Sequence, residues 1–365
     1  MKRALFLLTV LLTMTACHKE QDNRNRLLLL GDIHYDLLEN HDLGWLATTK
    51  DDLRQVTTEY SVFTAKFWDR FSERLAQRTK SAPFSAVLQM GDISEGLAGT
   101  PELARQMAHS VFAAVDSIGF EVPVIIAKGN HDITGPGARE AFNEIYLPNM
   151  ARLSGHERLE SANYSTEIGD MLFVCFDPWE ESDNKHKLDR LEQQLSASDA
   201  RYKFVMVHEP VIPINERCWH LFRRTPEQRE RLLHIIAGHR AIVLCAHMHL
   251  YSLVRRDTPD GPILQIMVNS VVRDSTLLQP RNVITQYGES LALDNPSWEP
   301  ETLEQRCAWL KEETPHIKYF KQADLPGYGV LTIDPRTDNL TLEYYAAFGE
   351  EPYDVVDLSA ILNQK

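Results

Sequence analysis

Few cysteines, no basic run and no internal repeat characterise this sequence, and each absence excludes a class of protein. Only five of the 365 residues are cysteine, and no CxxC pair occurs, so a structural zinc site is not expected. The formal net charge is −14, and without a basic run to displace counterions we expect no nucleic-acid groove. The acidic balance still permits a small phosphorylated substrate, because bound metal ions would reverse the local field. With 43% hydrophobic residues, the chain has the composition of a folded protein with a sizeable core.

The N-terminus carries a targeting pattern. Two basic residues precede an apolar run over residues 5–12, which is too short for a spanning helix and is typical of a secretory signal. The stretch Met14-Thr15-Ala16-Cys17 resembles a bacterial lipobox, which implies cleavage before Cys17 and lipidation of its side chain. Methionine is unusual at the first of these positions, so a plain signal peptide is the alternative. We predict a signal peptide over residues 1–16, a polar tether over 17–26, and an exported protein of the cell envelope, lipid-anchored to a bacterial membrane.

Four further cysteines remain after Cys17. Cys175 and Cys245 lie within apolar, strand-like runs, so we expect each to be a small buried side chain. Cys218 and Cys307 could pair in an oxidising compartment, and the sequence leaves this open.

Strand and helix patterns alternate along the first half, and hairpin patterns dominate the second. Apolar runs without alternation predict strands covered on both faces. A helix over residues 62–77 would place Phe63, Phe67, Phe71 and Leu75 on one face. The remaining predicted strands cover 27–30, 86–90, 122–127, 163–168, 171–176, 202–207, 241–245, 250–255, 263–268, 330–333 and 340–345, and the remaining helices 101–117, 187–195, 225–236 and 300–311. The pattern predicts an α/β fold, a four-layer α/β/β/α sandwich of two mixed sheets flanked by helices.

Two segments look like insertions into one catalytic domain that spans residues 27–365. One covers about 35–60, directly after the first strand, and the other about 271–325, with Trp298 and Trp309. Loops after the strands of such sheets tend to form the rim of a site. We therefore expect both segments to shape the substrate.

Side chains that bind metal ions follow several predicted strands. On extended backbone, residues two apart point to the same side, so an Asp-x-His or His-x-His pair can hold one ion. Taken singly, each candidate has an ordinary reading as a turn aspartate, a capping residue or a structural histidine. The candidates are Asp32, His34, Asp92, Asn130, His131, Asp132, His208, His247 and His249.

Other polar residues in the chain are weaker candidates. His239 follows a glycine at a helix end and precedes its strand, so we do not expect it to bind metal. His109, His186 and His234 lie on predicted helices and are expected on the surface or in packing. Arg217, Trp219 and His220 follow the His208 strand, where they either face the substrate or form a simple loop.

In order and spacing, the candidates resemble the calcineurin-like metallophosphoesterase family. That family's pattern is Asp-x-His, Gly-Asp, Gly-Asn-His-Glu/Asp, His and Gly-His-x-His, and it is matched here from Asp32 to His249. The resemblance implies two divalent or mixed-valence metal ions (Mn, Fe or Zn). It assigns Asp32, His34 and His249 to one metal, Asn130, His208 and His247 to the other, and Asp92 to the bridge between them.

The resemblance also implies a reaction on a small phosphorylated substrate. A bridging hydroxide would attack phosphorus in line, and the metals would stabilise the charge on the phosphate oxygens. His131 would act as the general acid that protonates the leaving oxygen, with Asp132 as the partner that orients it. Phosphomonoesters and phosphodiesters are not separated by these motifs.

Two residues depart from the family pattern. Ala246 replaces the glycine before His247, which should only crowd the turn. Glu95 stands where the purple acid phosphatase branch has an iron-binding tyrosine, so a ferric-tyrosinate centre is not expected. The alternatives to a phosphoesterase are a non-catalytic envelope lipoprotein with a structural metal site and a metallohydrolase of a non-phosphate substrate.

Overall fold

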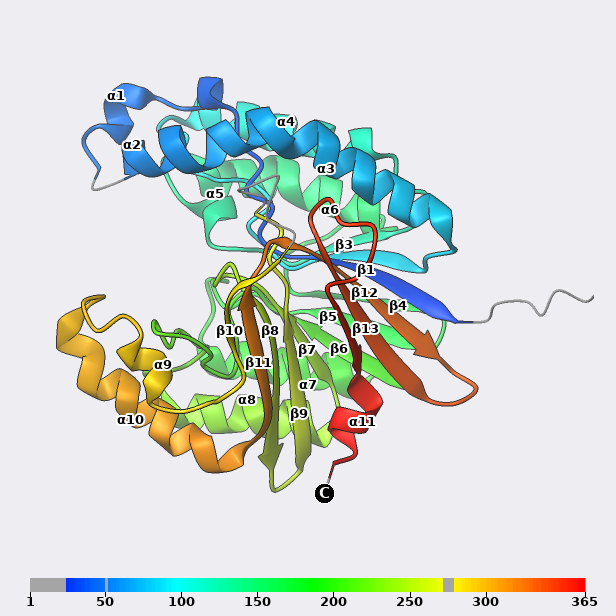
Figure 1. Cartoon of the computed structure of the whole chain (residues 1–365). Helices are drawn as coiled ribbons and strands as arrows, with labels where there is room; N and C mark the ends of the chain where they lie inside the picture. Colours follow the sequence, from blue (N-terminus) through cyan, green and yellow to red (C-terminus); the bar gives the residue numbers. More distant parts are fainter. Residues whose placement is uncertain (1–23, 50–51, 272–278, 365) are drawn as a thin grey trace, which may run out of the picture.

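The computed structural model describes residues 24–49, 52–271 and 279–364. It has two mixed sheets packed face to face, with helices on both outer faces (Figure 1). This arrangement confirms the four-layer α/β/β/α sandwich predicted from the sequence. The predicted signal peptide and Cys17 lie outside the described residues.

The first sheet holds six described strands, with its two parallel pairs at one end. β1 pairs in parallel with β2, and β2 with β3, whereas β12 runs antiparallel to β1. In spatial order the strands are β14 (Asp354–Asp357), β13 (Asn339–Ala346), β12 (Gly327–Asp334), β1 (Asn25–Leu30), β2 (Ala86–Gln89) and β3 (Val124–Ile126).

The second sheet holds eight described strands, with a parallel centre between antiparallel edges. β5, β6, β7 and β9 run parallel, and β4, β8, β11 and β10 pair antiparallel to their neighbours. In spatial order the strands are β10 (Arg281–Ile284), β11 (Ile317–Asp324), β8 (Tyr251–Thr258), β9 (Gly261–Met267), β7 (Ile242–Cys245), β6 (Tyr202–Met206), β5 (Met171–Cys175) and β4 (Tyr164–Ile168).

Helices cover the outer face of each sheet. α3, α4 and α6 lie over the first sheet, and α7 and α8 over the second (Figure 1). The helices are α1 (Leu43–Leu46), α2 (Asp52–Gln55), α3 (Ser61–Ser81), α4 (Pro101–Ile118), α5 (Ala138–Ala141), α6 (Leu147–Ser154), α7 (Asn184–Ser196), α8 (Pro226–Gly238), α9 (Ser290–Leu293), α10 (Leu303–Glu313) and α11 (Leu358–Leu362). A π-helical turn, Val56–Tyr60, leads into α3.

Alternating side chains along β5 separate two apolar cores. Phe173 faces the first sheet. It stacks on Phe204 of the neighbouring strand β6 at a centroid distance of 5.3 Å. Its neighbours Leu172 and Val174 belong to the second core, which is packed under α7 and α8. Because both faces of the strand are buried, its sequence is apolar at every position.

Local signals at helix ends were partly correct. Thr100 caps α4 by accepting a hydrogen bond from the backbone N–H of Leu103, and Pro101 occupies the first turn. The run Thr225-Pro226-Glu227-Gln228 likewise predicts a cap at Thr225 for α8, but this prediction is wrong, because the Thr225 side chain makes no capping hydrogen bond. Its hydroxyl instead donates to the carbonyl of Phe222 at 3.4 Å, so it closes the preceding turn.

The segment over residues 271–325 contributes to the second sheet, which the sequence did not indicate. β11 pairs with β8 over six residue pairs, and β10 pairs with β11 at the sheet edge. Only some positions of β11 are buried, and lysines occupy two of the others. The strand therefore has no continuous apolar pattern by which the sequence could predict it. β14 and α11 were missed for the same reason, because short edge elements bury few side chains.

The four described cysteines are free thiols. Cys175 and Cys245 are fully buried, as expected. Cys218 and Cys307, whose pairing was left open, form no disulfide, and the Cys218 thiol contacts the carbonyl of Asn215 at 3.1 Å. Within the described ranges, no helix has the length and apolarity needed to cross a membrane.

Candidate metal centre

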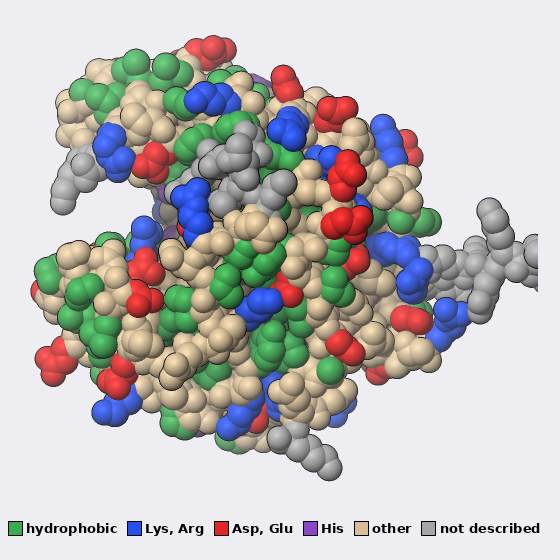
Figure 2. All heavy atoms as spheres, viewed as in Figure 1, with side chains coloured by type: hydrophobic (Ala, Val, Ile, Leu, Met, Phe, Trp, Pro, Cys, Tyr) green, Lys and Arg blue, Asp and Glu red, His purple; other side chains and the backbone are tan. Residues whose placement is uncertain are grey.

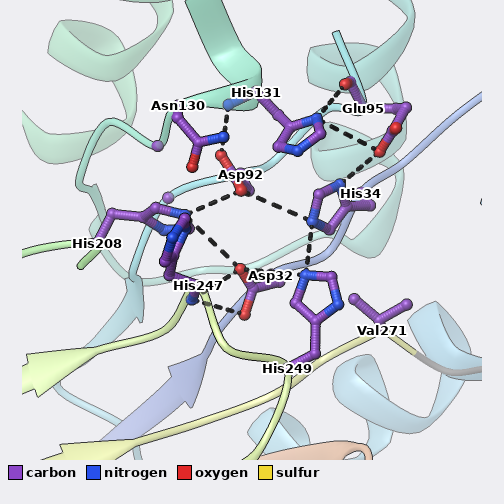
Figure 3. A network of polar contacts seen from close by, with 12 residues as sticks. Asp32, His34, Asp92, Glu95, Asn130, His131, His208, His247, His249 and Val271 are labelled. Atoms are coloured by element: carbon purple, nitrogen blue, oxygen red, sulfur yellow. Dashed lines mark hydrogen bonds and ion pairs between the residues drawn. The ribbon is translucent and has the colours of Figure 1, made fainter. Parts of the chain in front are cut away.

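The candidate ligands meet where five strands from both sheets end. Asp32 follows β1, Asp92 follows β2, and Asn130 and His131 follow β3 in the first sheet. His208 follows β6 and His247 and His249 follow β7 in the second sheet. Figure 3 shows their side chains pointing toward one another from these separate strand ends. The carboxyl ends of parallel strands share one edge of a sheet, which explains the convergence.

Left-handed backbone turns aim several of these side chains. His34, Asp92, His247 and His249 have φ angles of 46°, 51°, 74° and 53°, each of which costs about 1–3 kcal/mol for a residue other than glycine. The expectation that the Asp-x-His and His-x-His pairs meet on extended backbone is therefore wrong. The turns, not strand alternation, aim these side chains, so that Asp32 and His34 meet in one set of ligands while His247 and His249 enter different sets.

Gly129 permits a close backbone approach within the site. A Cβ atom placed on it would lie 2.1 Å from both the backbone nitrogen and the Oδ1 atom of Asp92. Only glycine allows the chain after β3 to pass so close to the Asp92 turn.

One set of candidate ligands, group one, consists of Asp32, His34 and His249, whose ligand atoms lie within 4.8 Å of one another. The Nε2 atoms of His34 and His249 are 3.0 Å apart, and His249 Nε2 lies 3.7 Å from Asp32 Oδ1. The Asp32 carboxylate also accepts two hydrogen bonds from the backbone N–H of His247. This contact fixes the end of β7 against the end of β1.

The second set, group two, consists of Asp92, His208 and His247. His208 Nε2 lies 2.9 Å from Asp92 Oδ2 and 3.2 Å from His247 Nδ1. His208 Nδ1 donates to the carbonyl of Met90, so Nε2 is the atom left to face the site. The same Asp92 oxygen is 3.7 Å from His34 Nε2, and it therefore lies between the two groups.

Unsatisfied polar atoms test whether these residues fit metal ions. Asn130 Oδ1 and His247 Nε2 are buried and have no hydrogen-bond partner among the described residues. Such atoms are costly to leave unpaired. Carboxylate, amide oxygen and imidazole together form a donor set that suits Mn, Fe or Zn. The residues fit a metal-binding site with Asp and His ligands.

His131 lies beside group one and is held by Glu95. Its ring is in edge contact with His34 at 4.8 Å, and its backbone N–H donates to Asp92 Oδ1 at 2.7 Å. The ring Nδ1 lies 2.7 Å from the Glu95 carbonyl, and because a carbonyl only accepts, Nδ1 carries the hydrogen. Nε2 is thus the ring atom available to exchange a proton.

Asp132 does not orient His131, which corrects the expectation from the sequence. Its carboxylate accepts backbone hydrogen bonds from Gly129, Asp92, Ile93 and Ser94 at 2.8–3.3 Å. It therefore clamps the turn after β2 to the turn after β3. Because the Asp132 carboxylate accepts hydrogen bonds from four N–H groups, its role is structural.

Glu95 has a role that the sequence did not reveal. Its Oε2 lies 2.7 Å from His34 Nδ1, and its Oε1 accepts from Gln55. It does not occupy a ligand position but holds the outer face of a candidate ligand, as a carboxylate often does for a metal-binding histidine. The only signal for it was its position three residues after Asp92.

Burial and mutual charge shift the pKa values of the site strongly. Burial raises the pKa of Asp32 to about 7. Burial opposes the charge on His208, but Asp92 outweighs this and raises the pKa of His208 to about 10. Burial and the neighbouring His208 lower the pKa of His247 to about 3, leaving a neutral imidazole. A metal ion entering group two would therefore displace a proton from His208.

Aromatic rings line both groups. Tyr60 stacks on His34 at 4.5 Å, and Trp219 stacks on His247 at 5.1 Å. Of the three loop residues considered as substrate contacts, Trp219 thus borders the site. His220 turns away from it, donating from Nδ1 to the Cys218 carbonyl and meeting the ring of Trp309. Tyr60, on the π-helical turn, had no sequence signal.

The remaining histidines lie away from the site. His239 ends α8 and contacts Ser196. His186 and His234 are exposed and pair with Asp183 and Asp260, and His109 is exposed on α4.

A family model, described as calcineurin-like phosphoesterase, matches residues 25–251. This range contains every candidate ligand. No curated protein matches the sequence significantly.

Several solved structures share the fold at low sequence identity. One is GAP50, the anchor in the inner membrane complex of Plasmodium, with a TM-score of 0.52, 12% identity, and coverage of 94% of this chain and 89% of that one. A dimetal phosphatase from Danio rerio has a TM-score of 0.51, 13% identity and coverage of 91% and 98%. Purple acid phosphatase PPD1 from yellow lupin seeds has a TM-score of 0.52, 14% identity and coverage of 94% and 56%.

Proposed function

Because the chain belongs to the calcineurin-like phosphoesterase family, we propose that it is a metal-dependent hydrolase of phosphoester bonds with a two-metal site. Group one with Asp32, His34 and His249 would hold one metal ion. Group two, joined by Asn130, would hold the other, and Asp92 would bridge them. A small phosphorylated molecule is the substrate class that this site favours.

The position of Asp92 Oδ2 carries this proposal. That atom lies 2.9 Å from a ligand nitrogen of group two and 3.7 Å from one of group one. A carboxylate placed between two sets of ligands can serve both, whereas a single-metal site would need only one set. The unpaired Asn130 Oδ1 supports the second position.

The metals, when bound, would neutralise phosphate oxygens and lower the pKa of a water ligand. The protein itself contributes by positioning the ligand side chains. Asp132 and Gly129 set the turn that carries Asp92, and Glu95 sets the ring of His34. His131, one-fifth exposed at its side chain, would give the proton on Nε2 to the leaving oxygen while Nδ1 remains bonded to the Glu95 carbonyl.

Hydrolysis assays test this function directly. We expect the protein lacking its first 17 residues to hydrolyse p-nitrophenyl phosphate or bis-p-nitrophenyl phosphate with Mn²⁺. His131→Ala should lower turnover about 10²- to 10⁴-fold while the metal content, measured by mass spectrometry, stays constant. His109→Ala, on the surface of α4, is the matched control. No turnover of either substrate with any divalent metal would contradict the proposal.

A non-catalytic role is the competing proposal. GAP50 shares this fold and is described as an anchor in the inner membrane complex. The fold therefore also occurs in a protein with an anchoring role. Under that role metals would only stabilise the fold, so His131→Ala would change nothing measurable. The intact set of ligands together with His131 favours catalysis.

We also propose export and lipid attachment at Cys17. The support is the N-terminal sequence alone, with its basic residues, short apolar run and lipobox-like stretch. Cys17→Ser should abolish fatty-acid labelling in cells, and labelling that persists in this variant would exclude the anchor.

A further inference from the structure

Two arginines and two tryptophans gather beside the candidate ligand His247. This Trp–Arg cluster consists of Arg217, Trp219, Arg223 and Trp298. Trp219 stacks on the ring of His247 and meets Trp298 edge-on at 5.8 Å. The guanidinium of Arg217 lies 5.9 Å from the centroid of each indole, and that of Arg223 lies 5.4 Å from Trp219.

A third arginine, Arg306, supports the cluster from behind. It is 1% exposed, and its guanidinium donates to the carbonyls of Glu216 and Trp298. It also lies under the Trp298 ring at 5.1 Å. Arg306 thereby joins the segment after β6 to the segment before α10, so the tryptophans have a fixed scaffold.

Among the described residues, Arg217 and Arg223 have no carboxylate within ion-pair distance, and unlike Arg306 they donate no hydrogen bond to a backbone carbonyl. Glu209 and Glu299 act on Arg223 only from longer range. A guanidinium whose face lies over an indole keeps its N–H groups free at its edge, where they can bind a carboxylate or a phosphate in bidentate fashion. Two cations without partners in an acidic protein indicate an anion that comes from outside.

A cavity adjoins the cluster at Arg217. It measures about 690 Å³, and its polar lining includes Arg217, Asn282, Asn295 and Gln322 together with the carboxylates of Glu216, Asp294 and Asp324. Met248, one of its lining residues, stands between the ligands His247 and His249 in the chain. Its volume is in the range of small-molecule sites. Figure 2 shows a hollow between the part carrying α1 and α2 and the part carrying α9 and α10, with Lys or Arg side chains on its walls.

We propose that the Trp–Arg cluster is a subsite for a second anionic group of the substrate. The preferred substrate would then be a small phosphorylated molecule that carries a further carboxylate or phosphoryl group. The metal centre would hold the phosphoester, the cavity the body of the molecule, and Arg217 and Arg223 the second charge. This inference rests on the proposed function, since it places the cleaved phosphoester at the metals.

Binding of non-hydrolysable phosphonates tests the subsite. Phenylphosphonate, 4-carboxyphenylphosphonate and 1,4-phenylenediphosphonate share a ring and differ in the second group. With the Mn²⁺-loaded protein, calorimetry should show about tenfold tighter binding of at least one of the two-anion probes than of phenylphosphonate. The probe that gains more identifies the second group as carboxylate or phosphoryl.

Variants of the arginines should remove this preference alone. In the protein with Arg217→Gln and Arg223→Gln, the affinity ratio between the two-anion probes and phenylphosphonate should fall to about one. Arg217→Lys with Arg223→Lys should keep part of the ratio, because charge remains but bidentate geometry is lost. Arg224→Gln, an exposed neighbour outside the cluster, should leave the ratio intact.

Failure of the subsite is distinguishable from failure of the proposed function. Equal binding of all three probes, no binding of any, or a preference that survives both Gln substitutions would overturn the subsite. Normal hydrolysis of p-nitrophenyl phosphate beside any of these results would leave the phosphoesterase proposal standing. An arginine-dependent preference without hydrolysis of any phosphoester would support the subsite and count against the catalytic proposal.

Discussion

Group one and group two share similar ligand types but lie in different surroundings. His34 of group one is backed by the Glu95 carboxylate and by Tyr60, next to a groove lined by Phe63 and Phe67. His247 of group two is instead covered by Trp219 and neighbouring guanidiniums. Since carboxylates strengthen and cations weaken the binding of a metal ion, we expect group one to hold its metal more tightly.

This difference also divides the space around the reacting phosphate. The side of group one offers apolar and aromatic contacts, whereas the side of group two offers positive charge. A substrate with one anionic and one apolar end would therefore bind in a single direction. The comparison teaches that similar ligand sets do not make equivalent metal positions when the residues behind them differ.

Asp92→Asn should have the largest effect, because it removes the atom that lies between the two groups. An amide has one acceptor oxygen and no charge, so it cannot serve both sets as the carboxylate does. We expect metal content measured by mass spectrometry to drop at both positions and hydrolysis to fall to background. Full metal loading in this variant would show that the groups do not share Asp92.

Gly129→Ala should disturb both groups through packing alone. The added Cβ would lie 2.1 Å from the Asp92 backbone nitrogen and Oδ1, so the turn must shift. Misplacement on the order of 1 Å lowers activity about 10²-fold, which steady-state kinetics would measure. Gly238→Ala at the end of α8 is the matched control, since nothing lies within 4 Å of its Cβ position. Equal activity of the two variants would contradict this account.

Glu95→Gln should act on group one selectively. The amide keeps one acceptor where the carboxylate holds both His34 and Gln55. Metal affinity at group one should fall about 10- to 100-fold, giving partial loading in a titration, while group two is unchanged. Gln55→Ala should produce a smaller effect in the same direction. Equal weakening at both positions would remove the distinction between the groups.

His220, in the loop that covers group two, should make the free energy of unfolding of the protein depend on pH. Burial and the charge of Arg229 lower its pKa to about 3, whereas the unfolded chain has the ordinary value of about 6.5. Below pH 6.5 the unfolded state binds the extra proton, so stability falls as pH drops toward 3. The slope is about 1.4 kcal/mol per pH unit.

Urea unfolding at pH 6.5, 5.5 and 4.5 measures this slope. His220→Gln should remove this contribution to the slope, because glutamine does not titrate in this range, whereas the contribution of His247 remains. His109→Gln, at an exposed position on α4, should leave the slope as in the wild type. A slope unaffected by the His220 substitution would show that the ring is protonated in the folded state.

Local sequence patterns predicted most of the fold. Uninterrupted apolar runs such as Leu27–Leu30 lie in strands because both of their faces are buried, and this burial is visible in composition. β14, at a sheet edge, and β11, next to one, escaped prediction because such strands bury few side chains and carry charges. The cap at Thr225 failed because a hydroxyl can satisfy either of two turns, and only the surrounding packing decides between them.

The sequence by itself determined which candidate ligands reach the site and at which ends of which strands. Asp32, Asp92, Asn130, His208 and His247 each follow an apolar strand, and the ends of parallel strands must meet. The tertiary structure alone decided how the side chains point. The left-handed turns at His34 and Asp92, the contact of Glu95 with His34 and the role of Asp132 all depend on neighbours distant in the chain. Strained backbone of this kind persists only when packing from several elements holds it, so no local pattern could reveal it.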